Sequence, residues 1–544
     1  MNVDAPVRID YTKNGQKISK QYDLMVVACD PRNLNGICDY DETEKGLFEK
    51  LINFTFHTSL LKVKRTKELQ HGVIFAPDPL ETMEGKVYGF RNESAKTFQL
   101  SNANMMDENL VTVYQLLGPE SDPLSPKEFE AILRKELAEL YWWPFGDDYE
   151  ILQSLTTPYF DHFLQKDLAY LAPWTWLDIQ GKNRTFYVHA STCFESALDC
   201  WGYENMILDP SSPSGQRLPA DKSAAIAIIG AGVSGLLMAV KLKDLGYNNI
   251  EILEKTDRYG GKTHTVEENG PFPPGIVAPT YCELGTCYLS PSYDAMVKDL
   301  AEYTVGNEQI DFGNYIKRGI AIPKNVQDYF HLPPEVMDSD EYTLRVAELQ
   351  LGLHHNALDD IEAQIALLEE LVKYLFIHEK IFGNAFPMPG KPVDEFLHLP
   401  YAAKFSKFLN HYGLNGLIGL LQYGYEVQGY GVLDKIPAYY GLVWINPPII
   451  EAILENSLIS AIDALGGAVV KLLGLIEKFI PDPAVKNYLQ KLIERIEAGE
   501  KKQIPIVTSW SEGWGDMWDQ IVQKQELSEV MELEVSIDSI RRLG

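Results

Sequence analysis

Cysteine and basic residues are both scarce in this chain of 544 residues. No two of its six cysteines form a Cys-x-x-Cys pair or show metal-ligand spacing, so we expect reduced thiols and no metal site. Lys and Arg number 48 against 77 Asp and Glu, which gives a formal charge of −29. This balance argues against nucleic acid as a partner and against simple electrostatic docking on anionic membranes. The cysteines are Cys29, Cys38, Cys193, Cys200, Cys282 and Cys287.

Signals for export are also missing at the start of the sequence, where residues 1–6 contain no apolar signal-peptide core. We therefore expect an intracellular protein that is cytoplasmic or peripheral to a membrane. A hydrophobic fraction of 45% can supply substantial cores, and the length predicts two or more domains.

The rest of the sequence is organised around a strand, a glycine turn and a helix. The strand is Ile226–Ile229, the turn is Gly230-Ala231-Gly232-Val233-Ser234-Gly235, and residues 236–242 continue as a helix. In a dinucleotide-binding fold the first glycine permits the tight turn and the second lets the backbone approach a pyrophosphate. The third allows helix and strand to pack closely.

A second strand, Ile250–Leu253, ends in Glu254, nineteen residues after Gly235. Dinucleotide-binding folds place the carboxylate that binds a ribose hydroxyl at this spacing. An ordinary glycine turn in an α/β unit is the alternative. The combination of strand, fingerprint, helix, second strand and acid favours a dinucleotide site.

Two further motifs are Arg258-Tyr259-Gly260-Gly261-Lys262 and Glu283-Leu284-Gly285-Thr286. In these two motifs, the sequence resembles the glutathione-reductase-like flavoproteins of the amine oxidase and phytoene desaturase type. The resemblance implies that the first motif wraps the FAD pyrophosphate and that the second passes near the flavin, so FAD is the expected cofactor. The cofactor-binding residues expected in this way are Gly230, Gly232, Gly235, Glu254, Arg258, Gly260, Gly261, Lys262, Glu283, Gly285 and Val535.

Within these flavoproteins the sequence is most similar to the polyunsaturated fatty acid isomerase branch, over most of the chain outside 456–503. Two positions depart from the family pattern. Amine oxidases usually have Arg where Lys262 stands, and His189-Ala190 occupies the place of a glycine and an acid beside the FAD pyrophosphate. The departure at His189-Ala190 bears on how tightly FAD binds. The segments that carry the resemblance are Arg258–His264, Pro158–His162, Gln180–Tyr187 and Gly429–Tyr440.

The resemblance implies that flavin N5 takes hydride from a bis-allylic carbon and returns it to another carbon, which shifts a double bond without net oxidation. The protein would supply an apolar tunnel that orients the chain and excludes water, and no side chain is assigned as catalytic. The aromatic candidates for this tunnel are equally consistent with helix core, and a solvated turn is the more ordinary interpretation of Arg318. The candidate substrate-binding residues are Tyr425, Tyr430, Tyr439, Tyr440, Trp444 and Arg318.

More than two hundred residues precede the nucleotide-binding strand, although this class of flavoprotein normally opens with it. Val7–Tyr22 is typical of a hairpin, and Asp23–Pro31 resembles a buried return strand of the FAD domain. Gln180–Val188 resembles the final strand of that domain, and a strand in 532–544 would continue into the hairpin. We interpret the chain as circularly permuted, with the usual termini joined through the polar linker 209–222.

The expected fold class is α/β, with a glutathione-reductase-like FAD-binding Rossmann domain, an α+β substrate domain and a helical region in circularly permuted order. The segment 458–503 could be a lid or packing hairpin, an interfacial membrane helix or an inserted spacer. The expected segments are an FAD-domain hairpin and return strand (1–30), part of the substrate domain (31–150), the closing part of the FAD domain (151–208), the linker (209–222), the Rossmann core (223–300), the substrate and helical domain (301–457), a helical hairpin (458–503) and the return to the FAD domain (504–544).

The sequence thus predicts an FAD-dependent isomerase that converts polyunsaturated fatty acids to conjugated products by a hydride shuttle. A long-chain unsaturated fatty acid is the expected partner, with weak membrane-surface contact through 458–503. Two alternatives remain open. One is a flavin amine or amino-acid oxidase that produces hydrogen peroxide, and the other is a flavin-binding scaffold without turnover.

Overall fold

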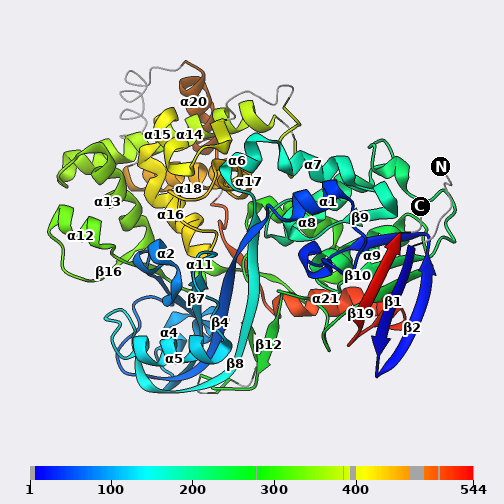
Figure 1. Ribbon diagram of the computed structural model, residues 1–544. Helices are drawn as coiled ribbons and strands as arrows, with labels where there is room; N and C mark the ends of the chain where they lie inside the picture. The colour runs from blue at the N-terminus through cyan, green and yellow to red at the C-terminus, as the bar shows by residue number, and fades with distance from the viewer. Residues whose placement is uncertain are drawn as a thin grey trace.

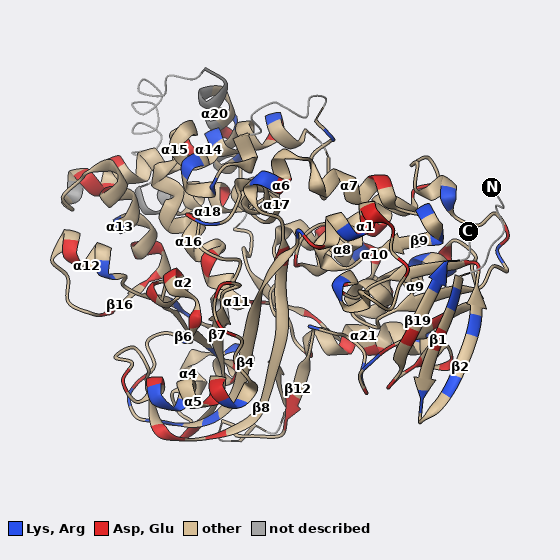
Figure 2. Cartoon of the chain, in the orientation of Figure 1, with Lys and Arg blue, Asp and Glu red and all other residues tan. Residues whose placement is uncertain are grey.

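The computed structural model describes residues 7–542 except 274, 277, 384, 393–399, 466–482 and 500–502. Figure 1 shows a nucleotide-binding lobe with short strands and a second lobe built on long strands under a helical cap. Figure 2 shows Lys and Arg positions scattered among Asp and Glu positions over both lobes. This distribution agrees with the excess of acidic residues in the sequence.

A five-stranded parallel sheet forms the core of the nucleotide-binding lobe. Its central strands are buried and consist of apolar residues, as expected for a parallel sheet covered by helices on both faces. The predicted strand–turn–helix unit is confirmed, and so is the α/β fold class with a Rossmann-like domain. In order across the sheet the strands are β18 (Met531–Glu532), β11 (Ile250–Leu253), β10 (Ile226–Ile229), β3 (Leu24–Val27) and β9 (Thr185–Tyr187).

Three distant parts of the chain contribute to this sheet. Val26 of β3 lies opposite Ile228 of β10 on one side and opposite Phe186 of β9 on the other. The expected return strand and final strand therefore both belong to the nucleotide-binding sheet. The permuted order is one interpretation of these pairings, and it stays a prediction.

A three-stranded antiparallel sheet lies beside the parallel one. β1 (Val7–Lys13) pairs with β2 (Gln16–Tyr22) as the predicted hairpin, and it also pairs with β19 (Ser536–Arg542), with Val7 opposite Arg542. Figure 1 shows the blue β1 next to the red β19. The stretch that we expected to be one strand is divided into β18 and β19, because Glu534 has a left-handed conformation (φ 57°) that breaks the extended backbone.

A mixed seven-stranded sheet forms the base of the second lobe. β8 runs through the boundary predicted at residue 150 and pairs with β4 as far as His162, so 151–162 belongs to this sheet. Two small sheets connect the lobes, β12 (Thr265–Glu268) with β13 (Thr280–Glu283) and β14 (Gln309–Asp311) with β17 (Thr508–Trp510). The seven strands are, in order, β16 (Val336–Asp338), β15 (Arg318–Ala321), β5 (Val73–Phe75), β6 (Glu84–Asn92), β7 (Glu108–Leu117), β4 (Ile52–Arg65) and β8 (Phe145–His162).

Helices cover the parallel sheet and cap the long one. α9 packs against α8 and α21, whereas α13 to α18 and α20 form the cap seen in Figure 1. The helices are α1 (Glu42–Phe48), α2 (Asp78–Thr82), α3 (Glu93–Phe98), α4 (Leu100–Ala103), α5 (Pro126–Leu137), α6 (Gln165–Ala169), α7 (Ala172–Ile179), α8 (Ala197–Leu208), α9 (Val233–Asp244), α10 (Asp294–Asp299), α11 (Phe312–Tyr315), α12 (Lys324–Phe330), α13 (Ser339–Leu351), α14 (Ala357–Phe382), α15 (Phe405–Tyr412), α16 (Ile418–Gly424), α17 (Ala438–Trp444), α18 (Pro447–Leu465), α20 (Pro483–Glu497) and α21 (Gly513–Lys524).

Part of the predicted hairpin 458–503 lies outside the described residues. Within the described part, α20 packs on α14 and α18, with Leu492 buried and the rings of Phe376 and Tyr488 6.3 Å apart. Among all the residues that the structure describes, no helix is long and apolar enough to cross a membrane.

Candidate functional site

The glycine turn between β10 and α9 has the backbone that a dinucleotide requires. Gly230 has a φ of 105°, which favours glycine, and Gly232 is the N-cap of α9. A Cβ placed on Gly235 would lie 2.0 Å from the carbonyl oxygen of Gly230, so helix and strand are packed too closely for any other residue. The N-terminus of α9 is thus presented at the carboxyl edge of the sheet, where anions bind favourably.

Glu254 follows β11 at the same edge. Its Oε2 accepts a hydrogen bond from the Ala231 N–H at 2.8 Å, and its Oε1 accepts one from the Thr256 N–H at 2.8 Å. The carbonyl oxygen of Glu254 accepts from the Val535 N–H at 2.8 Å. The structure therefore brings the predicted acid and Val535 next to the glycine turn.

A second glycine loop packs on the first. The Gly260 N–H donates to the Ala231 carbonyl at 2.9 Å, and a Cβ on Gly261 would lie 3.0 Å from the Gly232 Cα. The Arg258 guanidinium donates to the Gly261 carbonyl at 2.6 Å and so is tied to its own loop. Two stretches of bare backbone are thereby held face to face at the edge of the sheet.

Four charged or titratable side chains gather beyond β3 and β9. Arg32 forms an ion pair with Asp30 at 2.8 Å and another with Asp161. Burial raises the pKa of Asp161 to about 7, although the nearby Lys262 opposes this shift. His189 Nδ1 lies 3.9 Å from Asp161 Oδ2, and burial lowers the pKa of His189 to about 4, so this imidazole is neutral near pH 7.

This cluster bears on the departure at His189-Ala190. A carboxylate from another part of the chain, Asp161 at the end of β8 in the other sheet, lies beside His189. Sequence reasoning missed Asp30, Arg32 and Asp161 as site residues. Asp30 carried a usable signal, because it lies three residues after the end of the parallel strand β3, whereas nothing in the local sequence placed Asp161 at this edge.

Lys262 connects the glycine loops to a cavity between the lobes. Its Nζ lies 2.5 Å from Glu195 Oε1, and this carboxylate raises the pKa of Lys262 against the opposing effect of burial. The cavity has a volume of about 90 Å³. Its other cation is Arg91, which is buried between the rings of Tyr114 and Tyr288. The remaining wall includes Phe56, Phe75, Tyr88, Leu155, Tyr159, Leu284, Gly285, Val427, Tyr430 and Trp444.

The predicted substrate residues divide between the cavity wall and the core behind it. Tyr430 and Trp444 line the cavity, with ring centroids 5.3 Å apart. Tyr425 packs behind Tyr430 at 5.4 Å, and Tyr439 and Tyr440 are buried in α17. The Tyr440 hydroxyl accepts the Phe163 N–H at 2.6 Å, which is a structural contact.

Arg318 stacks on Tyr423 at 5.5 Å and is not part of the cavity wall. The Glu283 carboxylate is occupied by the Trp514 N–H at 2.7 Å and the Thr265 hydroxyl at 2.9 Å. Gly285 lies in the wall, and a Cβ there would come within 1.8 Å of the Lys262 carbonyl. The cofactor and substrate roles of these residues stay predictions.

The residues present fit FAD. Two glycine backbones and a helix N-terminus suit a pyrophosphate, and Glu254 suits a ribose hydroxyl. Oδ2 of the buried Asp161 accepts no hydrogen bond within the described part of the chain. A buried oxygen without a donor is costly, so this atom suits a ligand hydroxyl.

Parts of this chain are similar to known proteins. A family described as NAD(P)-binding Rossmann-like domain matches residues 228–304. The polyenoic fatty acid isomerase of Ptilota filicina is 26% identical over 232 residues, which are 42% of this chain and 42% of that protein. The tryptophan 2-monooxygenase of Agrobacterium vitis is 30% identical over 131 residues, 23% of this chain and 16% of that protein. This chain therefore spans less than half the length of either relative.

The fatty acid isomerase from P. acnes that produces CLA is similar in structure, with a TM-score of 0.30 and 16% sequence identity over 59% of this chain and 58% of that one. Residues 228–304 match the NAD(P)-binding Rossmann-like domain, the cofactor is FAD, and the chain is homologous to a polyenoic fatty acid isomerase over 42% of its length.

Proposed function

We propose that this protein is an FAD-dependent isomerase that moves double bonds of polyunsaturated fatty acids into conjugation. The observation that carries the proposal is the cavity between the lobes, which meets the nucleotide-binding loops at Lys262 and Gly285. Most of its wall is aromatic or aliphatic, as an acyl chain requires. The homology to a polyenoic fatty acid isomerase supports the same substrate class.

The bound flavin supplies reversible acceptance of hydride, and the chain supplies position and a dry environment. Tyr159 and Tyr430 stack with centroids 5.6 Å apart, and both residues line the cavity. Aromatic faces stabilise positive charge, so these rings suit a substrate that becomes electron-deficient. Arg91 lies in the wall and Arg318 does not. The Arg91 guanidinium is paired with Glu93 at 2.7 Å and donates to the Glu283 carbonyl at 2.6 Å, so a fatty acid carboxylate would have to share it with these partners.

The cavity has to widen when an acyl chain enters. Its volume of about 90 Å³ holds roughly three water molecules, which is less space than a drug-sized ligand occupies. Tyr430 and Trp444 lie on segments of the cap, so rotation of these side chains is the simplest way to enlarge it.

Anaerobic incubation of the FAD-loaded protein with linoleic acid tests the proposal. We expect a conjugated diene, detected by its ultraviolet absorption, without hydrogen peroxide. Substrate deuterated at the bis-allylic carbon should return its label to the product. Loss of the label to water would contradict the hydride shuttle.

An oxidase of amines or amino acids is the second candidate, because an L-amino-acid oxidase of Neurospora crassa is 34% identical over 89 residues, which are 16% of this chain and 12% of that protein. Aerobic incubation with amines and amino acids should then give peroxide in proportion to the substrate consumed. A flavin-loaded protein that converts neither class of substrate would favour the scaffold interpretation.

A further inference from the structure

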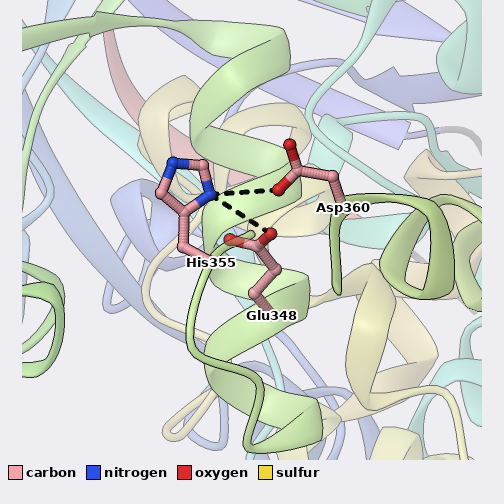
Figure 3. A group of neighbouring side chains, drawn as sticks. All are labelled: Glu348, His355 and Asp360. Carbon is pink, nitrogen blue, oxygen red and sulfur yellow. Dashed lines mark hydrogen bonds and ion pairs between the residues drawn. The ribbon is translucent and has the colours of Figure 1, made fainter. Parts of the chain in front are cut away.

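Three side chains outside the flavin site meet at the corner between α13 and α14. Figure 3 shows Glu348 on α13, His355 in the connection and Asp360 in the first turn of α14. His355 Nδ1 lies 3.5 Å from Glu348 Oε1 and 3.0 Å from Asp360 Oδ1. One ligand atom of each side chain lies within 4.8 Å of the other two.

Glu348 has an unsatisfied atom directed into this group. Its side chain is completely buried, and its Oε1 accepts no hydrogen bond within the described part of the chain. The other oxygen is held by the Arg345 guanidinium at 2.6 Å, which fixes the carboxylate with Oε1 facing His355. A buried carboxylate oxygen without a donor costs free energy that a ligand to this atom would recover.

We propose that Glu348, His355 and Asp360 form a binding site for a divalent transition-metal ion, with Zn²⁺ as the preferred ion. Zn²⁺ binds imidazole and carboxylate ligands at about 2.0–2.2 Å in a tetrahedron, so ligand atoms lie roughly 3.3–3.6 Å apart. The separations of 3.0 and 3.5 Å are close to this spacing. A small approach of the two carboxylates completes the three-ligand set.

Access and charge also suit a divalent cation. The His355 and Asp360 side chains are 45% and 32% exposed, so an ion can enter from solvent and keep a water molecule as its fourth ligand. Arg345 is surrounded by Glu348, Asp360 and, at 3.7 Å, Glu341. Three carboxylates and one guanidinium leave two negative charges when His355 is neutral, which a divalent ion compensates.

The bound ion would fasten the start of α14 to the end of α13. α13 packs on α16, which leads into the segment that carries Tyr430 in the cavity wall. Zinc binding is therefore expected to stabilise the helical cap. The imidazole ligand favours Zn²⁺ over Mg²⁺ and Ca²⁺, which prefer oxygen ligands only.

Calorimetric titration of the EDTA-treated, FAD-loaded full chain with ZnCl₂ tests the site. We expect one equivalent of Zn²⁺ to bind and the Tm to rise by about 2 °C or more, while MgCl₂ has no effect. His355→Ala should weaken Zn²⁺ binding at least about tenfold, because it removes a direct ligand. His354→Ala removes the neighbouring exposed imidazole and is the matched control, with unchanged affinity expected.

Co²⁺ provides a second readout, because its visible spectrum reports tetrahedral coordination by the protein. Glu348→Gln should abolish that spectrum, and retention of bound FAD shows that the variant is folded. If Glu348→Gln does not fold, His355→Ala tests the site alone, since His355 lies in an exposed connection. Absence of Zn²⁺ binding to the wild type, or equal losses in His354→Ala and His355→Ala, would overturn the proposal.

Discussion

The Glu254 carboxylate accepts a hydrogen bond from the backbone N–H of Ala231, with 2.8 Å between Oε2 and N. This contact ties the end of β11 to the glycine turn after β10. It sets the position of the carboxylate relative to the N-terminus of α9 before any nucleotide binds. Such preorganisation lowers the cost of ordering the site on binding.

Glu254→Ala should weaken FAD binding by roughly tenfold to a hundredfold, because hydrogen bonds to a charged group contribute about 1.5–3 kcal/mol. Titration of the apoprotein with FAD, followed by flavin fluorescence, measures this loss. Glu251→Ala is the matched control on the same strand. Its carboxylate binds Tyr22 at 2.7 Å and Lys20 at 2.7 Å, so it should alter stability and leave FAD affinity unchanged.

Substitutions at two glycines of the turn should affect different properties, FAD binding in one case and stability in the other. A Cβ on Gly232 meets no protein atom closer than 3.8 Å, so Gly232→Val should fold and lose FAD because the side chain occupies the space of the pyrophosphate. Gly235→Ala places its Cβ 2.0 Å from the Gly230 carbonyl and should lower the Tm even without FAD. Thermal unfolding of both apoproteins, together with their flavin content, distinguishes these effects. Equal decreases in the Tm of the two apoproteins would contradict the expectation that only Gly235→Ala lowers stability.

Variants at Tyr430 and Tyr440 should distinguish a loss of activity from a loss of stability. Tyr430→Ala removes part of the cavity wall and should slow conjugated-diene formation while FAD stays bound, since misplacement of a substrate by about 1 Å can cost a hundredfold in rate. Tyr440→Phe leaves the buried Phe163 N–H without its acceptor and should cost about 1–3 kcal/mol of stability. Initial rates and denaturant unfolding test both variants. A Tyr440→Phe enzyme that is stable but slow would move Tyr440 into the substrate site.

The pH dependence of stability should show the titration of the buried Asp199 carboxyl. Burial raises its pKa from 3.8 to about 7, and its Oδ1 has no hydrogen-bond partner in the described structure. The folded state therefore holds a proton more tightly than the unfolded state, and relative stability is lost as the pH rises from about 4 to 7. Asp199→Asn does not titrate, so its advantage over the wild type should grow across this range, by up to about 4 kcal/mol.

Urea unfolding at several pH values measures that trend. The control is Asp209→Asn, which alters an exposed acid whose pKa is lowered by hydrogen bonds from Ser211. The stability that Asp209 contributes is lost as the pH falls, so this variant should show the opposite slope. A flat difference between Asp199→Asn and the wild type would contradict the raised pKa of Asp199.

Reconnection of the chain tests the proposed permutation. Arg542 lies opposite Val7 on adjacent strands, so a short turn can join β19 to β1. A variant joined in this way and opened between Ala220 and Asp221, both exposed, should fold and bind FAD. Opening the same joined chain between Ala227 and Ile228 breaks a buried strand and should abolish folding. Failure of both openings would count against the permuted interpretation.

The sequence by itself determined the nucleotide-binding unit. The strand, the turn from Gly230 to Gly235, the helix and Glu254 all lie within about thirty residues, and each depends on local backbone geometry. The hairpin that includes Asn14 and Gly15 was predictable for the same reason. In these segments a periodic apolar pattern and turn residues at fixed spacing leave little choice of structure.

The tertiary structure alone decided which distant side chains meet. Asp161 meets Arg32 and His189 because β8 ends beside the segments that follow β3 and β9, and no local pattern encodes that approach. The sequence pattern could not distinguish the wall residue Tyr430 from the core residue Tyr439, because both are buried aromatic residues. The Glu348–His355–Asp360 group likewise depends on how α13 turns into α14. Burial and hydrogen bonding arise from packing between segments, and only the folded chain specifies that packing.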